Sequence, residues 1–348
     1  MDKLHIVSIV GARPNFVKLA ALSPELRRVA NETIIHTGQH YDYKMSKIFF
    51  DEMGIPVPDS HLEIVEITHG RQTGKMLMAI ESILISDQPD AVVIFGDTNS
   101  TFAGALAASK LHIPIVHIES GVRSFDRKMP EELNRIMIDH ISDMLFCPTW
   151  NAACNIAIEG ISKTRSYMCG DVMVDLLERQ PVKLLQPVVY DNYYLLTIHR
   201  EENNDPYKLK SIFTGLSGLT EDIIFPCHPK IRKYIESFDL QKNIHVINPV
   251  GYFEMRELEK HAIRIITDSG GVQKEAYLLK VPCITLRENT EWIETLIGNW
   301  NILTGYKSND IYNAFTIDPD LDAYDPIVFG ESGVCKRVSN KIVEVLYG

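Results

Sequence analysis

The chain has 348 residues, of which 45% are hydrophobic and 23% are charged, and its formal net charge is −11. A chain of this length is longer than a single hydrophobic core usually accommodates, which predicts two domains of ~150 residues each. The negative charge argues against a nucleic acid as partner, although the local charge of a pocket can still attract a small anion. No stretch approaches the ~18 apolar residues of a membrane span, and the first residues lack the apolar core of a signal peptide. We therefore expect a cytoplasmic protein with no membrane partner.

The six cysteines form no CxxC pair and do not cluster with histidines. Their spacing argues against a zinc site or a disulfide framework. We expect reduced, mostly buried thiols and no bound metal.

Apolar runs of strand length alternate with helical patterns along the chain. In the first half these runs span 4–10, 33–37, 91–96, 113–118, 144–147 and 166–170. In the second half they span 193–199, 222–228, 244–249, 263–269 and 281–286. Such alternation predicts parallel sheets covered by helices, and its occurrence in both halves predicts two Rossmann-like domains.

The domain boundary is expected near Gly170. The stretch from Arg179 to Asn192 contains two prolines and no clear period, which is typical of a surface connection. The prediction is an N-terminal domain over 1–170 and a C-terminal domain over 171–335. Ligands of doubly wound sheets bind at the carboxyl ends of the strands, so two facing domains would form a cleft between those ends.

The segment GARPNFVK (11–18) follows the first predicted strand. A proline near a helix start is ordinary, and Arg13 before it fits a structural role. A helix N-terminus flanked by cations such as Arg13 and Lys18 also binds anions. Both interpretations stay open.

Carboxylates follow two further strands. Asp97 lies in GDTNST, where Asp97 or Thr98 also suits the N-cap of the next helix. Glu119 and Arg123 flank a glycine in HIESGVRS (117–124). A buried salt pair there would be costly to maintain without a function, and a solvated loop is the alternative.

The segment PEELNRIMIDH (130–140) opens a helix with Pro130 and two glutamates. Helix capping and the macrodipole alone would explain that pattern. If Glu131 shares a cleft with Asp97 and Glu119, one carboxyl can stay protonated while another acts as a base.

Two motifs of the second half follow strands. His199 in HREEN (199–203) is either a structural hydrogen bonder or a cation that stabilises a departing anion. In TDSGGVQKEA (267–276), Ser269, Gly270 and Gly271 open a helix, and Glu275 lies about one turn further on. Such backbone amides can hold a phosphate and such a carboxylate a ribose diol. The sequence has no GxGxxG after its first strand and no Walker loop, which argues against NAD and ATP.

With these motifs in order, the chain resembles the non-hydrolysing UDP-N-acetylglucosamine 2-epimerase family, from GARP at residue 11 to the TEW segment at residue 290. The resemblance implies an α/β GT-B fold, in which two Rossmann-like domains enclose the active site in a cleft between them. It also implies that a final helix over 336–346 returns to the N-terminal domain, with Val338, Ile342 and Val345 as its buried stripe.

The activity that the resemblance implies is that of an isomerase. The family inverts carbon 2 of UDP-N-acetylglucosamine, or of its 2,3-diacetamido-glucuronate analogue. It does so by anti elimination of UDP through a 2-acetamidoglucal, followed by re-addition of UDP. The reaction needs neither a metal nor another cofactor. A UDP-sugar partner, a homodimer and a role in making surface polysaccharide precursors are further expectations.

The resemblance also implies roles for individual residues. Asp97, Glu119 and Glu131 match the carboxylates of proton transfer, and His199 matches a histidine that acts near the diphosphate. The implied substrate contacts are Arg13, Lys18, Arg135, Ser269, Gly270, Gly271, Glu275 and Glu291. Gln39 and His40 match a region where some bacterial members bind a second, activating substrate molecule.

One segment departs from the common family pattern TERPE, because Trp292 and Ile293 replace its arginine and proline. The TEW form is similar to the branch that epimerises UDP-2,3-diacetamido-2,3-dideoxy-glucuronate. We expect Trp292 to supply apolar surface for the additional acetyl group, and Arg123 or Arg127 to pair with the sugar carboxylate. Core packing is the alternative role for Trp292.

A GT-B glycosyltransferase with the same nucleotide site is the alternative function. The carboxylate series of the N-terminal half favours elimination chemistry over the binding of an acceptor.

Overall fold

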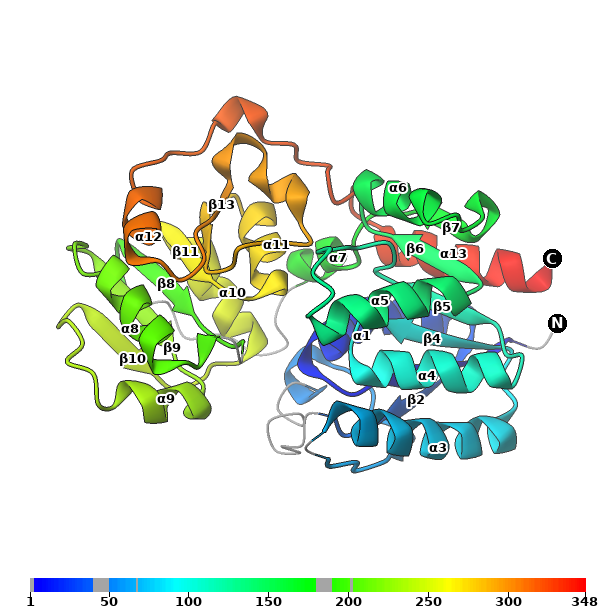
Figure 1. The fold of residues 1–348 in the computed structure, drawn as a ribbon. Helices are drawn as coiled ribbons and strands as arrows, with labels where there is room; N and C mark the ends of the chain where they lie inside the picture. The colour runs from blue at the N-terminus through cyan, green and yellow to red at the C-terminus, as the bar shows by residue number, and fades with distance from the viewer. Residues whose placement is uncertain (1–2, 40–49, 67, 180–189, 201–202) are drawn as a thin grey trace. The chain divides into compact units, whose positions relative to one another are not determined.

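The computed structural model describes residues 3–39, 50–66, 68–179, 190–200 and 203–348. Its contacts divide the chain into two compact units. Unit 1 comprises residues 1–182 and 327–348, and unit 2 comprises residues 183–326. Each unit contains its own parallel sheet with helices around it (Figure 1). The predicted fold class, two Rossmann-like α/β units, is confirmed.

Unit 1 has a parallel sheet of seven strands in the order β3-β2-β1-β4-β5-β6-β7. Its strands are β1 (His5–Val10), β2 (Asn31–His36), β3 (Ser60–His61), β4 (Ala91–Phe95), β5 (Ile115–Ile118), β6 (Met144–Cys147) and β7 (Ser166–Met168). The residues of β4, AVVIF, are all buried, as expected for a central strand covered on both faces.

The helices of unit 1 fall into two groups of neighbours. Its helical elements are α1 (Arg13–Val29), α3 (His69–Asp87), α4 (Asn99–Lys110), α5 (Pro130–Ile141), α6 (Trp150–Ile158), η1 (Lys163–Arg165), α7 (Met173–Glu178) and α13 (Val334–Tyr347). Helices α3, α4 and α5 lie side by side, and α1 contacts both α7 and α13 (Figure 1).

Helix α13 ends the chain yet belongs to unit 1. The carboxylate of Asp175 in α7 accepts N–H bonds from Gly333 (2.7 Å), Val334 (3.2 Å) and Cys335 (2.7 Å), so it caps the start of α13. Of the expected stripe, Val338 and Ile342 are fully buried, whereas Val345 near the end is 37% exposed.

Unit 2 repeats the arrangement with six parallel strands in the order β10-β9-β8-β11-β12-β13. Its strands are β8 (Tyr193–Thr197), β9 (Asp222–Pro226), β10 (Ile244–Ile247), β11 (Arg264–Thr267), β12 (Cys283–Thr285) and β13 (Asn301–Leu303). Its helical elements are α8 (Pro206–Gly215), α9 (Pro229–Ile235), α10 (Tyr252–His261), α11 (Gly270–Leu278), η3 (Ile293–Asn299), α12 (Ser308–Ala314) and η4 (Leu321–Ala323).

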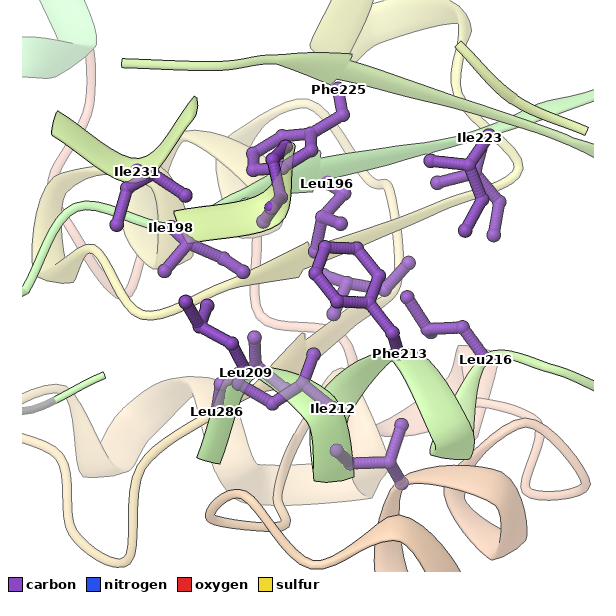
Figure 2. Packing of buried hydrophobic residues seen from close by; sticks show 14 of the residues in the cluster. Leu196, Ile198, Leu209, Ile212, Phe213, Leu216, Ile223, Phe225, Ile231 and Leu286 are labelled. Carbon is purple, nitrogen blue, oxygen red and sulfur yellow. The ribbon is translucent and has the colours of Figure 1, made fainter. Parts of the chain in front are cut away.

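A hydrophobic cluster of unit 2 lies between α8 and the sheet. Figure 2 shows Leu209 and Phe213 of α8 pointing toward Leu196 and Phe225 on the strands, and all four side chains are buried. This contact fixes α8 on the sheet and thereby sets the path of the chain that follows β8.

The strands β3 and β13 were not expected from the sequence. They contain only two and three residues, too few to show a period. The structure leaves the six cysteines unbridged, and four of them are buried. Among the described residues, no helix has the length and apolar character that crossing a bilayer requires.

Candidate active site

Both sheets have a point where the strand order reverses. This switch point lies between β1 and β4 in unit 1 and between β8 and β11 in unit 2. Ligands of doubly wound sheets bind at the carboxyl ends of such strand pairs. In unit 1, Arg13 follows β1 and Asp97 follows β4; in unit 2, His199 follows β8 and Ser269 follows β11.

In unit 1, Asn15 ties the turns after β1 and β4 together. Its Oδ1 accepts the N–H groups of Gly11 (3.3 Å) and Ala12 (3.2 Å) and the hydroxyl of Thr98 (3.1 Å). Its Nδ2 donates to the carbonyl of Phe95 (2.7 Å). The sequence analysis missed this residue, although a side chain that bonds back to the helix start is typical of the third helical position.

Lys18, in the second turn of α1, forms an ion pair with Glu119, which directly follows β5. Their Nζ and Oε1 atoms lie 2.6 Å apart, and both side chains are about nine-tenths buried. A Cβ at Gly96 would lie 2.8 Å from Lys18 Nζ, so glycine leaves the room that this pair needs. Glu119 has φ +72°, a conformation that costs a non-glycine residue ~1–3 kcal/mol and that clusters at functional sites.

Asp97 pairs with Arg135, whose Nε and Nη2 lie 2.9 and 2.5 Å from Asp97 Oδ2. Thr98, rather than Asp97, is the N-cap of α4, because its hydroxyl accepts the N–H of Thr101 (3.3 Å). The capping alternative for Asp97 is thereby excluded. Arg135 Nη1 also pairs with Glu132 Oε2 (2.9 Å), so one buried guanidinium joins two carboxylates.

The adjacent glutamates of α5 have different surroundings. Glu132 is buried, and its carboxylate accepts the N–H groups of Ser124 and Phe125, both at 2.9 Å. Glu131 is partly exposed and makes no ion pair with any residue that the structure describes. Glu132, which the sequence analysis did not single out, therefore fixes the chain between β5 and α5, whereas Glu131 retains an accessible carboxyl.

Arg123 lies in a buried ion network. Its Nη1 is 2.7 Å from Asp139 Oδ2, and its Nε is 2.7 Å from Glu159 Oε1. His117 Nδ1 is 2.7 Å from Asp139 Oδ1, and His117 Nε2 donates to the carbonyl of Gly96 (2.7 Å). The prediction that Arg123 pairs with a sugar carboxylate is wrong, because its guanidinium is buried and engaged.

The charge state of Asp139 follows from this network. Burial acts to raise the pKa of its carboxyl, but the hydrogen bond from His117 and the charges of His117 and Arg123 outweigh burial, so the pKa lies below its usual value.

In unit 2, buried Asp268 holds the chain that follows β8. Its Oδ1 accepts the N–H of His199 (2.9 Å), and its Oδ2 accepts the N–H of Arg200 (3.0 Å) and the Nδ2–H of Asn203 (2.9 Å). The side chain of His199 is exposed. The sequence analysis quoted Asp268 within TDSGG without giving it a role, and its position next to the helix N-cap was the available signal.

The two glycines that begin α11 have different surroundings. Ser269 is the N-cap. A Cβ at Gly270 would collide with Glu291 Oε1, so a larger residue there would displace this buried carboxylate. Gly271 is exposed, and a Cβ there would meet only Ser269 Oγ at 3.9 Å. The amides of a first helical turn have no intrahelical acceptor, so the surface at Gly271 is open to a ligand.

The TEW segment packs against the start of α11. Glu291 is buried and pairs with Arg287 (2.8 Å), with Arg200 at 4.0 Å. Trp292 is only 3% exposed, and the Nζ of Lys274 lies 4.0 Å from its ring centroid. The expectation that Trp292 offers apolar surface to a substrate is therefore wrong, and its core-packing alternative holds.

Glu275 is buried in α11 beside Tyr252. Burial raises the pKa of the Tyr252 phenol well above its usual value, and the charge of the neighbouring Glu275 carboxylate raises it further.

Gln39 belongs to unit 1 and caps α4. Its Oε1 accepts the N–H (2.9 Å) and the hydroxyl (2.7 Å) of Ser100. The other residue predicted for an activating site, His40, lies outside the described residues.

Two Rossmann-like units with polar clusters at their switch points define a GT-B protein. The calicheamicin glycosyltransferase shares this fold with the chain at 15% identity and a TM-score of 0.53, which shows the fold alone. The structure of UDP-GlcNAc 2-epimerase from Methanocaldococcus jannaschii, in complex with UDP-GlcNAc and UDP, matches far better. It has a TM-score of 0.87 and 42% identity, over 99% of this chain and 100% of that one.

Sequence comparison narrows the class to one family. The family model for UDP-N-acetylglucosamine 2-epimerase matches residues 25–342. A UDP-N-acetylglucosamine 2-epimerase homolog of Methanococcus maripaludis is 51% identical, over 99% of both chains. The UDP-2,3-diacetamido-2,3-dideoxy-D-glucuronate 2-epimerase of Pseudomonas aeruginosa is 45% identical, over 87% of this chain and 88% of that relative. The chain belongs to the UDP-N-acetylglucosamine 2-epimerase family and is an isomerase of the epimerase class.

Proposed function

We propose that the protein inverts carbon 2 of a UDP-linked 2-acetamido sugar by eliminating UDP and adding it back. The observation that carries this proposal is the set of carboxylates at the switch point of unit 1, of which Asp97 and Glu119 are each held by a cation. The similar structure from Methanocaldococcus jannaschii contains UDP-GlcNAc and UDP, which supports the same class of ligand for this protein.

The elimination step needs a base at carbon 2 and support for the departing diphosphate. Glu131 is the proposed base, because it makes no ion pair with a described residue and can exchange a proton without first losing a cation. As the proton leaves carbon 2, the bond between carbon 1 and the UDP oxygen breaks and a 2-acetamidoglucal forms. UDP then adds back to carbon 1, and a proton returns to carbon 2 from the opposite face.

Basic residues of unit 1 are proposed to position the carboxylates and to attract the anionic substrate. Lys18 and Arg135 hold Glu119 and Asp97 in fixed positions, so these carboxylates meet the sugar without reorganisation. Arg13, at the first position of α1, lies at a helix N-terminus that suits an anion.

Unit 2 is proposed to hold UDP. The open surface at Gly271 suits a phosphate, and Ser269 and Gly270 stand beside it at the helix start. Glu275 is proposed to bind the ribose diol, and His199 to stabilise the departing diphosphate in its cationic form. Buried Glu291 contributes through Arg287 and Arg200, which it orients.

The elimination route is tested by solvent labelling. Incubation of the enzyme with UDP-GlcNAc or its diacetamido uronate analogue in deuterated water should place deuterium at carbon 2 of the epimer, and prolonged incubation should release free UDP and glycal. Proton NMR measures both. Epimer without deuterium would sink the elimination route, and transfer that requires an added acceptor would support a glycosyltransferase.

The assembly and the compartment are also proposed. Met78 and Ile85 of α3 are 70% and 57% exposed one heptad apart, which supports a homodimer through α3. Free thiols support a reducing cytoplasm, where surface polysaccharide precursors would be made. Sedimentation equilibrium of the wild type and of Met78→Glu tests the dimer, which this substitution should dissociate.

A further inference from the structure

The chain between β5 and α5 carries an aromatic residue in an unusual state. Phe125 is 74% exposed and has φ +60°. Positive φ is a genuine outlier for a bulky residue, and such strain persists only where the surroundings enforce it. Because the ring is exposed, it gains no hydrophobic stabilisation that would offset the strain. Within the free protein, therefore, nothing about Phe125 itself explains its conformation.

The surroundings that enforce this conformation belong to the proposed site. Glu132 holds the backbone N–H of Phe125 at 2.9 Å and is itself paired with Arg135. Arg135 in turn holds Asp97. A chain of three polar contacts thus connects the position of Phe125 to a carboxylate of the switch point. The same segment begins at Glu119 and ends two residues before Glu131.

Arg127 stands two residues after Phe125. It is exposed and makes no ion pair with a described residue, whereas Arg123 and Arg135 are buried and paired on both sides of it. An exposed ring and an uncommitted guanidinium are thus held on one short, fixed segment. Together they suit a ligand with an apolar group and an anionic group.

We propose that Phe125 and Arg127 determine the choice of sugar. Phe125 packs against an acetyl methyl at carbon 3, and Arg127 pairs with a carboxylate at carbon 6. The substrate is then a UDP-linked 2,3-diacetamido uronate rather than UDP-GlcNAc. This assignment rests on the proposed 2-epimerase function, and it gives to this segment the tasks first expected of Trp292 and Arg123.

The test compares kcat/KM for UDP-2,3-diacetamido-2,3-dideoxy-glucuronate and for UDP-GlcNAc. The wild type should prefer the uronate by well over ~10-fold, because a site built for a charged group rejects a ligand that lacks it. Arg127→Gln should reduce that preference by at least ~10-fold, and Phe125→Gly by a similar factor, while Phe125→Tyr, which keeps the ring, retains it.

Matched controls lie elsewhere in unit 1. Ile158→Ala removes an apolar side chain of α6 that is 82% exposed, and Lys163→Gln removes an exposed cation from η1. Both should leave the preference unchanged. Phe125→Gly should also melt no lower than the wild type, because glycine adopts positive φ without strain. A purely structural Phe125 would instead lower the melting temperature and reduce kcat/KM equally for both sugars.

Two results would overturn the proposal: a wild type without preference for the uronate, or a preference that survives both Phe125→Gly and Arg127→Gln. Failure of the underlying function has a different signature. It would appear as no deuterium at carbon 2 with either sugar, whatever the variant.

Discussion

The two units share a topology but build their switch points from different chemistry. The six strands of unit 2 are arranged in the same order as β3-β2-β1-β4-β5-β6 of unit 1. Unit 1 has one further strand, β7, at the edge of its sheet. At the unit 1 switch point, carboxylates pair with cations, as in Lys18 with Glu119. At the unit 2 switch point, Asp268 instead accepts backbone amides, and a glycine leaves a helix start open.

The contrast teaches that strand order decides where a site can form, while the residues at the strand ends decide what it can do. Charged side chains with fixed partners suit proton transfer. Backbone amides at a helix start suit a phosphate. We therefore expect substitutions of the unit 1 carboxylates to affect turnover, and substitutions of Gly271 or Glu275 in unit 2 to affect nucleotide binding.

The largest expected effect is that of Glu131→Gln. Turnover should fall by ~10²–10⁴, the usual contribution of positioned proton transfer, with little change in UDP affinity. Glu275→Gln in unit 2 should show the reverse pattern, with weaker UDP binding. Steady-state kinetics and calorimetric titration with UDP measure both. Equal loss of UDP affinity in the two variants would break the division of labour.

The next effect concerns the buried network under the unit 1 carboxylates. Removing one partner of such an ion pair costs about 3–5 kcal/mol, so Asp139→Asn should lower the free energy of unfolding by that amount at pH 7. Glu159→Gln should cost less, because its side chain is 23% exposed. Urea denaturation measures both changes, and an unchanged midpoint for Asp139→Asn would contradict the network's role.

The carboxyl of Asp139 also makes the free energy of unfolding depend on pH. Its pKa is lowered in the folded state, so its stabilisation is complete above the unfolded-state value of about 3.9 and is lost as the pH falls through the folded-state value. The wild type should thus lose stability below about pH 4 more steeply than Asp139→Asn.

The smallest expected effects are those of alanine substitutions at the two glycines of α11, which should differ in their influence on stability and on UDP binding. Gly271→Ala should stabilise the helix by up to ~1 kcal/mol and weaken UDP binding about tenfold, or ~1.4 kcal/mol, because a methyl group would occupy the phosphate's position. Gly270→Ala should destabilise unit 2, since Glu291 must move. Thermal melts with and without UDP distinguish the two, and unchanged UDP affinity in Gly271→Ala would remove the phosphate from this helix start.

Much of the fold followed from the sequence because long apolar runs such as AVVIF mark buried parallel strands by composition alone. The short strand β13 carries no such signal. The carboxylates at the strand ends were found for a related reason, since the topology fixes which ends meet.

The partners of each charge could not be found in this way. Arg123, Arg127 and Arg135 look alike in sequence, yet only Arg127 is left without an ion pair among the described residues, because Asp139, Glu159 and Asp97 reach the other two through the fold. The role of Trp292 stayed open between substrate contact and core packing for the same reason: its neighbour Lys274 lies on another element.

The cap that Asp175 places on α13 has a consequence for synthesis on the ribosome. Unit 2 is one continuous segment, whereas unit 1 needs residues from both ends of the chain. The N-terminal unit therefore emerges first but cannot complete its packing until the last helix has been translated, and the later unit can close before it. A chain that stalls on the ribosome before residue 334 lacks α13, so the faces of α1 and α7 that contact it stay uncovered.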